Sequence, residues 1–256
     1  MNSTAVELTP QQVESYKKNG YISVEALTTP EELEQIREIY ERIFHDNPDV
    51  ANRCDVWGVD VDGEERRTMN FTEPSRFEPA LLEMQFMRNA ERIAKQILGP
   101  EAKFSGDIML YKQAKVGHSS PWHQDEAWCD PNFDYKFVGV WLTLDDTNVE
   151  SGCMHYIPGS HKEGMQLHRR IHTHLSINLM QIDDVDESRA VSVPLKAGGA
   201  AFHDGRTLHF GKANSSPNNR RAYVCRFWVE PVKRDTPQDF PWQRNVESDY
   251  FQKHKA

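Results

Sequence analysis

After residue 99 the sequence alternates short runs of β-branched and aromatic residues with turn residues, and this pattern narrows the fold more than any other feature. Such runs predict strands, and their regular interruption by Gly, Pro and Ser is typical of a β-sandwich or jelly roll. We therefore expect a β core over residues 101–230. The predicted strands cover residues 104–112, 122–128, 137–144, 154–157, 200–203, 209–213 and 222–230.

The first hundred residues carry helix signals instead. Capping boxes at Thr9 (T-x-x-Q) and Thr29 (T-x-x-E) each predict the start of a helix. A short strand is expected at residues 21–24, and a third helix over residues 79–98. We expect these helices to support the β core. The second helix presents apolar residues at helical spacing, namely Leu33, Ile36, Ile39, Tyr40, Ile43 and Phe44.

Two segments show no clear periodicity. Residues 47–79 are polar, and a connection of this length is either a surface loop or a lid over a site. Residues 231–256 are predicted to form a tail that lies over the outside of the molecule. No internal repeat is visible, so we expect residues 1–256 to form one domain, mainly β with flanking helices.

Composition excludes several classes of function. The net charge of -9 argues against nucleic acid as a partner, because phosphate binding needs a clustered positive field. No apolar run is long enough to span a membrane. The first residues lack a basic segment followed by an apolar one, so we do not expect a secretory signal. We expect a cytoplasmic monomer or homodimer that acts on a small molecule. Four widely spaced cysteines are expected to be reduced thiols, namely Cys54, Cys129, Cys153 and Cys225.

The chemistry is expected to centre on His123 and Asp125. If both lie on one strand, their side chains point to the same face and converge on one point. A metal needs a third ligand, and the best candidate is His209. Two histidines and one carboxylate on one side of a metal form the facial triad of non-haem Fe(II) oxygenases, which leaves positions open for substrate and O2.

Other histidines compete for this role. The H-x-E at His161 follows a turn sequence, so a structural role is favoured there. The H-x-H at His172 and His174 lies in a basic stretch and reads more simply as a solvated surface. His203 is an alternative third ligand, although the turn sequence after it puts it at a strand end.

A 2-oxoglutarate-dependent oxygenase also needs a cation for the distal carboxylate of this cosubstrate, and the fork of an arginine matches a carboxylate bidentately. Arg220 and Arg221 begin the strand that follows His209. A hairpin through residues 216–219 would bring that strand beside the strand of His209. Without a metal triad nearby, the same arginines would be read as a solvated strand end.

An ordered set of motifs resembles the phytanoyl-CoA dioxygenase family. The resemblance covers roughly residues 8–230, and the set is far more specific than an isolated H-x-D. The motifs are NGY at residues 19–21, YKQ at 111–113, WHQD at 122–125, VWLTLDD at 140–146, ESGC at 150–153 and IPGSH at 157–161.

The resemblance implies a double-stranded β-helix, of the jelly-roll or cupin-like type, that uses Fe(II), 2-oxoglutarate and O2, with ascorbate as an activator. It implies hydroxylation of an unactivated C–H bond, with release of succinate and CO2. By position, His123, Asp125 and His209 match the iron ligands and Arg220 matches the cosubstrate arginine. Asp125 is intact, which disfavours halogenation. Further residues of the cosubstrate pocket are implied to be Lys112, Trp141 and Asn218.

The substrate is not implied by the family name. Desaturation and cyclisation remain open, as do a cupin-like metalloenzyme without 2-oxoglutarate and a non-catalytic binding or sensing module on the same fold. Core packing is the simpler reading for any single aromatic candidate. The residues expected to face a substrate are Asn70, Phe71, Met109, Trp128, His155 and Arg226.

Overall fold

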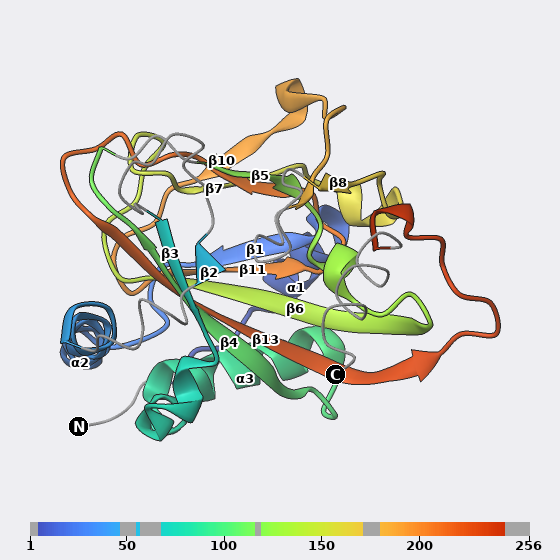
Figure 1. Cartoon of the computed structure of the whole chain (residues 1–256). Helices are drawn as coiled ribbons and strands as arrows, with labels where there is room; N and C mark the ends of the chain where they lie inside the picture. The colour runs from blue at the N-terminus through green and yellow to red at the C-terminus, as the bar shows by residue number, and fades with distance from the viewer. Residues whose placement is uncertain (1–4, 47–54, 57–67, 116–118, 171–179, 244–256) are drawn as a thin grey trace, which may run out of the picture.

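The computed structural model describes residues 5–46, 55–56, 68–115, 119–170 and 180–243, and within them the chain is mainly β with a few helices. Its centre is an antiparallel sheet of seven strands that faces a second sheet of four (Figure 1). In spatial order the larger sheet contains β1 (Tyr21–Val24), β11 (Ala200–Asp204), β6 (Phe133–Thr143), β13 (Arg220–Lys233), β4 (Lys103–Lys112), β3 (Thr68–Thr72) and β2 (Asp55–Val56). The smaller contains β10 (Val191–Val193), β7 (Met154–Tyr156), β12 (His209–Gly211) and β5 (Ser120–His123), and β8 (Arg169–Arg170) pairs with β9 (Met180–Gln181).

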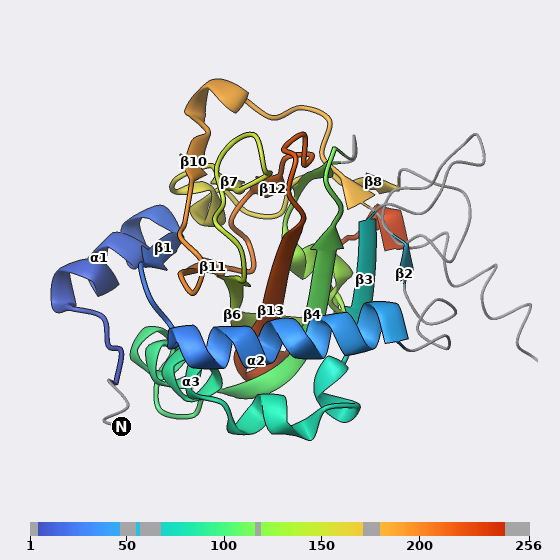
Figure 2. The same ribbon diagram turned by 90° about the vertical axis from the view of Figure 1, so that its left-hand side faces the viewer.

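Two helices cover the face of the large sheet that points away from the small sheet. They are α2 (Pro30–Glu41) and α3 (Gln85–Leu98), and both views place them on that side (Figures 1 and 2). A third helix, α1 (Pro10–Asn19), leads into the edge strand β1. The structure therefore has three layers: helices, the seven-stranded sheet and the four-stranded sheet.

Side chains of β13 alternate between the two interlayer spaces, as the period of a strand requires. Tyr223 and Phe227 pack in the core beneath the helices. Ala222 packs between the two sheets, and Val224 contacts the same cluster. The alternation decides which residues of β13 can reach a site between the sheets, because residues 220, 222, 224 and 226 share that face.

The helix caps agree with the sequence in part. The Thr9 capping box forms in full, with Thr9 and Gln12 each binding the other's backbone N–H. At Thr29 only the threonine half forms. The Glu32 carboxylate instead accepts hydrogen bonds from the backbone N–H groups of Gln85 and Phe86, which begin α3. A carboxylate is stabilised at a helix N-terminus, so Glu32 joins two helices rather than closing its own box.

Several predicted boundaries are wrong. The expected helix over 79–98 is a 3-10 turn at Pro79–Glu83 followed by α3, because Met84 is extended. The expected strand over 122–128 ends at His123, and Asp125–Trp128 forms a 3-10 turn. The expected tail begins later, since β13 continues to Lys233.

The predicted neighbour of β13 is also wrong. This strand pairs with β4 and β6 in the large sheet, whereas β12, which carries His209, lies in the small sheet. Residues 47–54 and 57–67, which make up most of the connection predicted as a surface loop or a lid, lie outside the described residues. Residues 244–256 of the expected tail also lie outside them. In the described part of the chain, none of the helices has the length and apolarity needed to cross a membrane.

Candidate active site

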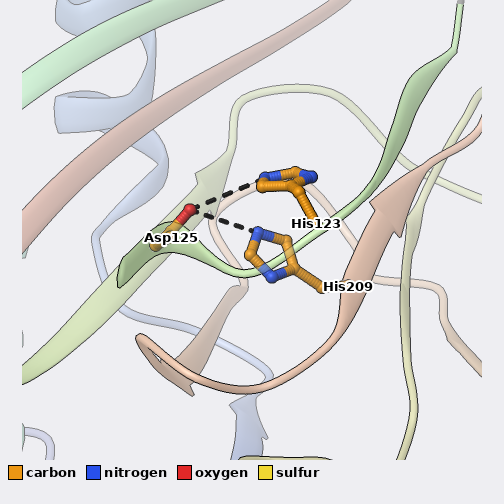
Figure 3. A group of neighbouring side chains, drawn as sticks. All are labelled: His123, Asp125 and His209. Carbon is orange, nitrogen blue, oxygen red and sulfur yellow. Dashed lines mark ion pairs between the residues drawn. The ribbon is translucent and has the colours of Figure 1, made fainter. Parts of the chain in front are cut away.

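His123 and His209 lie directly opposite one another on the paired strands β5 and β12. Their ring centroids are 4.1 Å apart. The Nε2 atoms of His123 and His209 lie 3.6 and 3.5 Å from Oδ1 of Asp125 (Figure 3). Donor atoms of the three side chains all lie within 4.8 Å of one another. Donors about 2.1 Å from a shared ion are roughly 3 Å apart, so a small closure suffices for metal binding.

Both histidines are oriented for coordination through Nε2. Nδ1 of His123 lies 2.7 Å from the carbonyl oxygen of Pro121, and Nδ1 of His209 lies 2.9 Å from that of Thr207. A carbonyl can only accept, so each Nδ1 donates its proton and each Nε2 keeps its lone pair. Burial and the adjacent His123 hold the pKa of His209 well below its usual value, which favours the neutral form that binds a metal.

Asp125 reaches the site from a 3-10 turn and not from the strand of His123, which corrects the expected geometry. The two side chains converge because the chain turns after Gln124, whose backbone is still extended. Burial alone would raise the pKa of Asp125, but His209, His123 and His203 together hold it well below its usual value. The carboxylate is therefore available as an anionic ligand.

His203, considered above as an alternative ligand, contacts the triad without belonging to it. Its Nε2 lies 3.2 Å from Oδ2 of Asp125, the oxygen that does not face the other two histidines. Its Nδ1 lies 3.2 Å from the hydroxyl of Tyr156. The hydroxyl can donate to Nδ1 while Nε2–H donates to Asp125. His203 therefore orients the carboxylate, and sequence reasoning missed this role.

Two further contacts hold the turn that carries Asp125. The Gln124 side chain is fully buried and points away from the triad, where it forms hydrogen bonds with the backbone of Gly164, Gln166 and Arg206. The carboxylate of Glu126 is buried and accepts two hydrogen bonds from Arg206, at 2.7 and 2.8 Å. Because Arg206 lies just before β12, this ion pair links the Asp125 turn to the strand of His209.

Arg220, Lys112 and Trp141 gather between the sheets. Arg220 is 2% exposed, its guanidinium carbon lies 5.5 Å from the centre of the Trp141 ring, and Lys112 is its partner across β4. Burial lowers the pKa of Arg220 to about 10, and burial followed by the charge of Arg220 lowers the pKa of Lys112. The positive charges of Arg220 and Lys112 repel each other in this buried space, so the pair favours binding of an anion.

Several donors in this group are unsatisfied within the described residues. Nε and one terminal nitrogen of Arg220, and Nε1 of Trp141, are buried without a hydrogen-bond partner there. Such orphaned donors are rare in folded proteins and point to a missing acceptor. The Lys112 ammonium donates to the carbonyl oxygens of Gly211 and Lys212, each at 3.0 Å, which leaves one of its three N–H groups. A dicarboxylate such as 2-oxoglutarate fits this donor set.

Two other predicted positions lie outside that group. Asn218 is exposed in the turn before β13, where its carbonyl oxygen accepts from Asn214, and its role stays a prediction. Arg221 points to the helix side of the sheet and pairs with Asp145 and Glu41. The preference for Arg220 over its neighbour therefore agrees with the alternation along β13.

A cavity of about 400 Å³ opens beside the triad. Asp125 lines it together with Trp128, whose ring meets the His123 ring edge-on at 5.3 Å. Asn70 and Arg226, two of the residues expected to face a substrate, also line it. Sequence reasoning did not assign several other residues that line the cavity. These are Thr72, Glu73, Ser105, Gly106, Asp107, Ile108, Gly139, Val224 and Cys225.

The remaining candidates do not line this cavity. Phe71 and Met109 are buried in the core beneath the helices, on the opposite face from Asn70 and from Ile108. His155 is half-buried, with its ring against Phe210, and alternates with residues that pack between the sheets. For Phe71 this agrees with core packing, the simpler of the two interpretations given above.

The structure also locates one of the other histidines that were considered as metal ligands. His161 lies in a 3-10 turn, where its Nε2 is 3.2 Å from the carbonyl oxygen of Lys17 near the end of α1. His172 and His174 fall outside the described residues. Within the described part of the chain, the grouping of possible metal-binding side chains consists of His123, Asp125 and His209 alone.

Curated relatives of similar length match most of the chain. A phytanoyl-CoA dioxygenase domain-containing protein 1 of Danio rerio is 24% identical over 85% of this chain and 89% of its own. A probable alpha-ketoglutarate-dependent hypophosphite dioxygenase of Stutzerimonas stutzeri is 25% identical over 82% of this chain and 75% of its own.

A solved structure, EvdO2 from Micromonospora carbonacea var. aurantiaca, aligns with a TM-score of 0.82 and 29% identity, covering 93% of this chain and 98% of that one. The structure of the same protein complexed with 2-oxoglutarate aligns with a TM-score of 0.81. The family model for phytanoyl-CoA dioxygenase (PhyH) matches residues 16–222, which include the triad and the buried Arg220. The chain therefore belongs to the phytanoyl-CoA dioxygenase (PhyH) family.

Proposed function

We propose that this protein is an Fe(II)- and 2-oxoglutarate-dependent dioxygenase that hydroxylates an unactivated C–H bond of a small-molecule substrate, releasing succinate and CO2. The observation that carries the proposal is the convergence of His123, Asp125 and His209 on one point beside a cavity. Three ligands on one side of an ion leave the other positions for cosubstrate and O2. The bound iron would supply the activation of O2.

In this proposal the chain binds and orients the reactants. Arg220 binds the distal carboxylate of 2-oxoglutarate with the donors that lack a partner among the described residues. Trp141 offers its Nε1–H and supports the guanidinium from its ring face. Lys112 offers its remaining N–H group, and its positive charge favours binding of the anionic cosubstrate over water. Burial of the whole group strengthens each interaction, because the local dielectric constant is low.

The comparisons support the proposal by the names of related proteins. The Stutzerimonas stutzeri relative is described as alpha-ketoglutarate-dependent, and EvdO2, at 28% identity, has been solved complexed with 2-oxoglutarate. The compounds printed in the relatives' names differ, phytanoyl-CoA for the Danio rerio protein and hypophosphite for the Stutzerimonas stutzeri protein, so neither is assigned to this chain.

The test measures succinate formed from 2-oxoglutarate by the protein with Fe(II), with ascorbate present to keep the iron reduced. Arg220→Met should raise the KM for 2-oxoglutarate by at least tenfold, because a charge-assisted hydrogen bond contributes about 1.5–3 kcal/mol. Metal binding should be unchanged. Arg221→Met is the matched control, since this neighbouring arginine faces the helices and pairs with Asp145.

Two results would contradict the proposal. Iron-loaded protein that forms no succinate and does not bind 2-oxoglutarate would favour a metalloenzyme of another kind or a non-catalytic binding module. An unchanged KM in Arg220→Met, with wild-type turnover, would remove Arg220 from the cosubstrate site.

A further inference from the structure

Two glycines lie in one row of the large sheet beside the cavity. Cross-strand pairing sets His203, Gly139, Arg226 and Gly106 side by side on β11, β6, β13 and β4. Gly139 and Gly106 have no side chains and both line the cavity. The space over Gly106 is open, whereas the His203 imidazole lies over Gly139. Arg226 lies between these two positions, on the same face of β13 as Arg220.

Arg226 is held in place within this row. Its Nε donates to the hydroxyl of Ser105 at 3.1 Å. Its guanidinium carbon lies 5.2 Å from the centre of the Phe137 ring and 5.7 Å from that of the Trp228 ring. Aromatic faces attract a cation but leave the edge of the guanidinium fork open for hydrogen bonds in its plane. These contacts thus orient the Arg226 side chain, and none of them brings a negative charge to it.

Other arginines near the centre of the molecule have carboxylate partners. Arg206 pairs with Glu126, Arg221 with Asp145 and Arg234 with Asp134. In the described ranges, Arg226 makes no ion pair within 4.0 Å, although it lines a cavity that also contains Asp125. The other arginine without an ion pair in those ranges and buried between the sheets is Arg220, for which a cosubstrate carboxylate is proposed above.

We propose that Arg226 binds a carboxylate of the substrate and that the apolar body of the substrate extends past the His203 imidazole toward the metal. This inference rests on the proposed function and names the substrate class: a monocarboxylate with an apolar chain or ring. The fork of an arginine binds a carboxylate through two parallel hydrogen bonds, which fixes direction as well as position. Arg220 and Arg226 would then hold the cosubstrate and the substrate from opposite ends of one strand face.

The cavity is unsuited to a more highly charged group. Two acids, Glu73 and Asp125, line it. These acids would repel a phosphate or diphosphate more strongly than a single carboxylate. Trp128, Ile108 and Val224 supply apolar wall around them.

The spacing between strands gives an estimate of the distance between Arg226 and the reacting carbon of the substrate. His203 contacts Asp125 and lies two strands from Arg226, so their Cα atoms are roughly 10 Å apart. A carboxylate on Arg226 would thus be several bonds from the oxidised carbon. Suitable probes are 4-phenylbutanoate and octanoate, each compared with its primary amide, which has the same shape and no charge.

The experiment measures the dissociation constant of each probe by calorimetry, using Co(II)-loaded protein with and without 2-oxoglutarate so that no turnover occurs. Wild-type protein should bind at least one acid about ten times more tightly than its amide, as expected for a charge-assisted hydrogen bond. Arg226→Met and Arg226→Gln should reduce this preference to less than twofold while 2-oxoglutarate affinity stays the same. Arg234→Met is the matched control and should keep the preference.

Two outcomes would overturn the inference: no preference for either acid in the wild-type protein, or a preference that persists in folded Arg226→Met or Arg226→Gln. The glutamine variant keeps a polar contact to Ser105 if the methionine variant does not fold. Succinate formation without acid preference would contradict this inference alone. Acid preference that depends on Arg226, without 2-oxoglutarate binding or succinate formation, would contradict the proposed function alone.

Discussion

Nε2 of His203 lies 3.2 Å from Oδ2 of Asp125 and holds the carboxylate with its other oxygen, Oδ1, toward His123 and His209. The contact joins the two sheets, because His203 lies on β11 of the large sheet and the two histidines lie on β5 and β12 of the small one. The metal site therefore depends on the packing of the sheets against each other.

Replacing His203 by Leu should weaken metal binding by about 10- to 100-fold, the usual effect of removing a partner of a metal ligand. The measurement is a Co(II) titration followed by absorbance. His155→Leu removes a histidine from the same region that does not contact the triad, and its affinity should match that of the wild type. Equal affinities in both variants would show that His203 does not position Asp125.

Gly139→Ala should disturb the contact between His203 and Asp125, because the added methyl group would meet the His203 ring. A Cβ at residue 139 would lie 2.6 Å from Nε2 of His203, closer than packed atoms allow, so the imidazole must move. We expect weaker Co(II) binding with a nearly unchanged thermal midpoint. Gly211→Ala is the control, because its Cβ would meet nothing nearer than 3.6 Å. Similar Co(II) affinities in the two variants would contradict the steric account.

Arg206→Met should destabilise the fold by about 3 kcal/mol, since it leaves the buried Glu126 carboxylate without its main partner. The free energy of unfolding in urea measures this effect. Arg189→Met breaks an ion pair with Glu163 that is about 40% exposed on both sides, and it should cost less than about 1 kcal/mol. Equal losses in the two variants would disprove the difference attributed to burial.

His168 should make stability depend on pH. Burial lowers its pKa from 6.5 to about 4, and its Nε2 accepts a hydrogen bond from the Gln124 N–H. Between these two values the unfolded chain takes up a proton that the folded chain does not, so stability is present above pH 6.5 and is lost as pH falls toward 4. The contribution lost between pH 7 and 5 is about 2 kcal/mol.

The check compares urea unfolding of wild-type protein and His168→Gln at pH 7 and 5. The wild-type protein should lose about 2 kcal/mol more than the variant between these two values. Parallel losses would mean that His168 is not the group responsible.

Local features were predictable because they depend on neighbours within a few residues. The Thr9 capping box formed as its sequence predicted. Errors arose where a prediction relied on regular extension of a pattern. Asp125 was placed on a strand that ends at His123, and one continuous helix was expected over residues 79–98, where the extended Met84 separates a 3-10 turn from α3.

The sequence by itself determined the family, the β-rich core after the helices, and the chemical identity of the side chains that converge. Only the tertiary structure decided that His203 orients Asp125, that Glu32 caps a helix 53 residues away, and that Arg226 stands between two glycines. The physical reason is register. Which residues face each other across strands depends on the packing of both sheet faces, and a shift of one residue reverses every side chain.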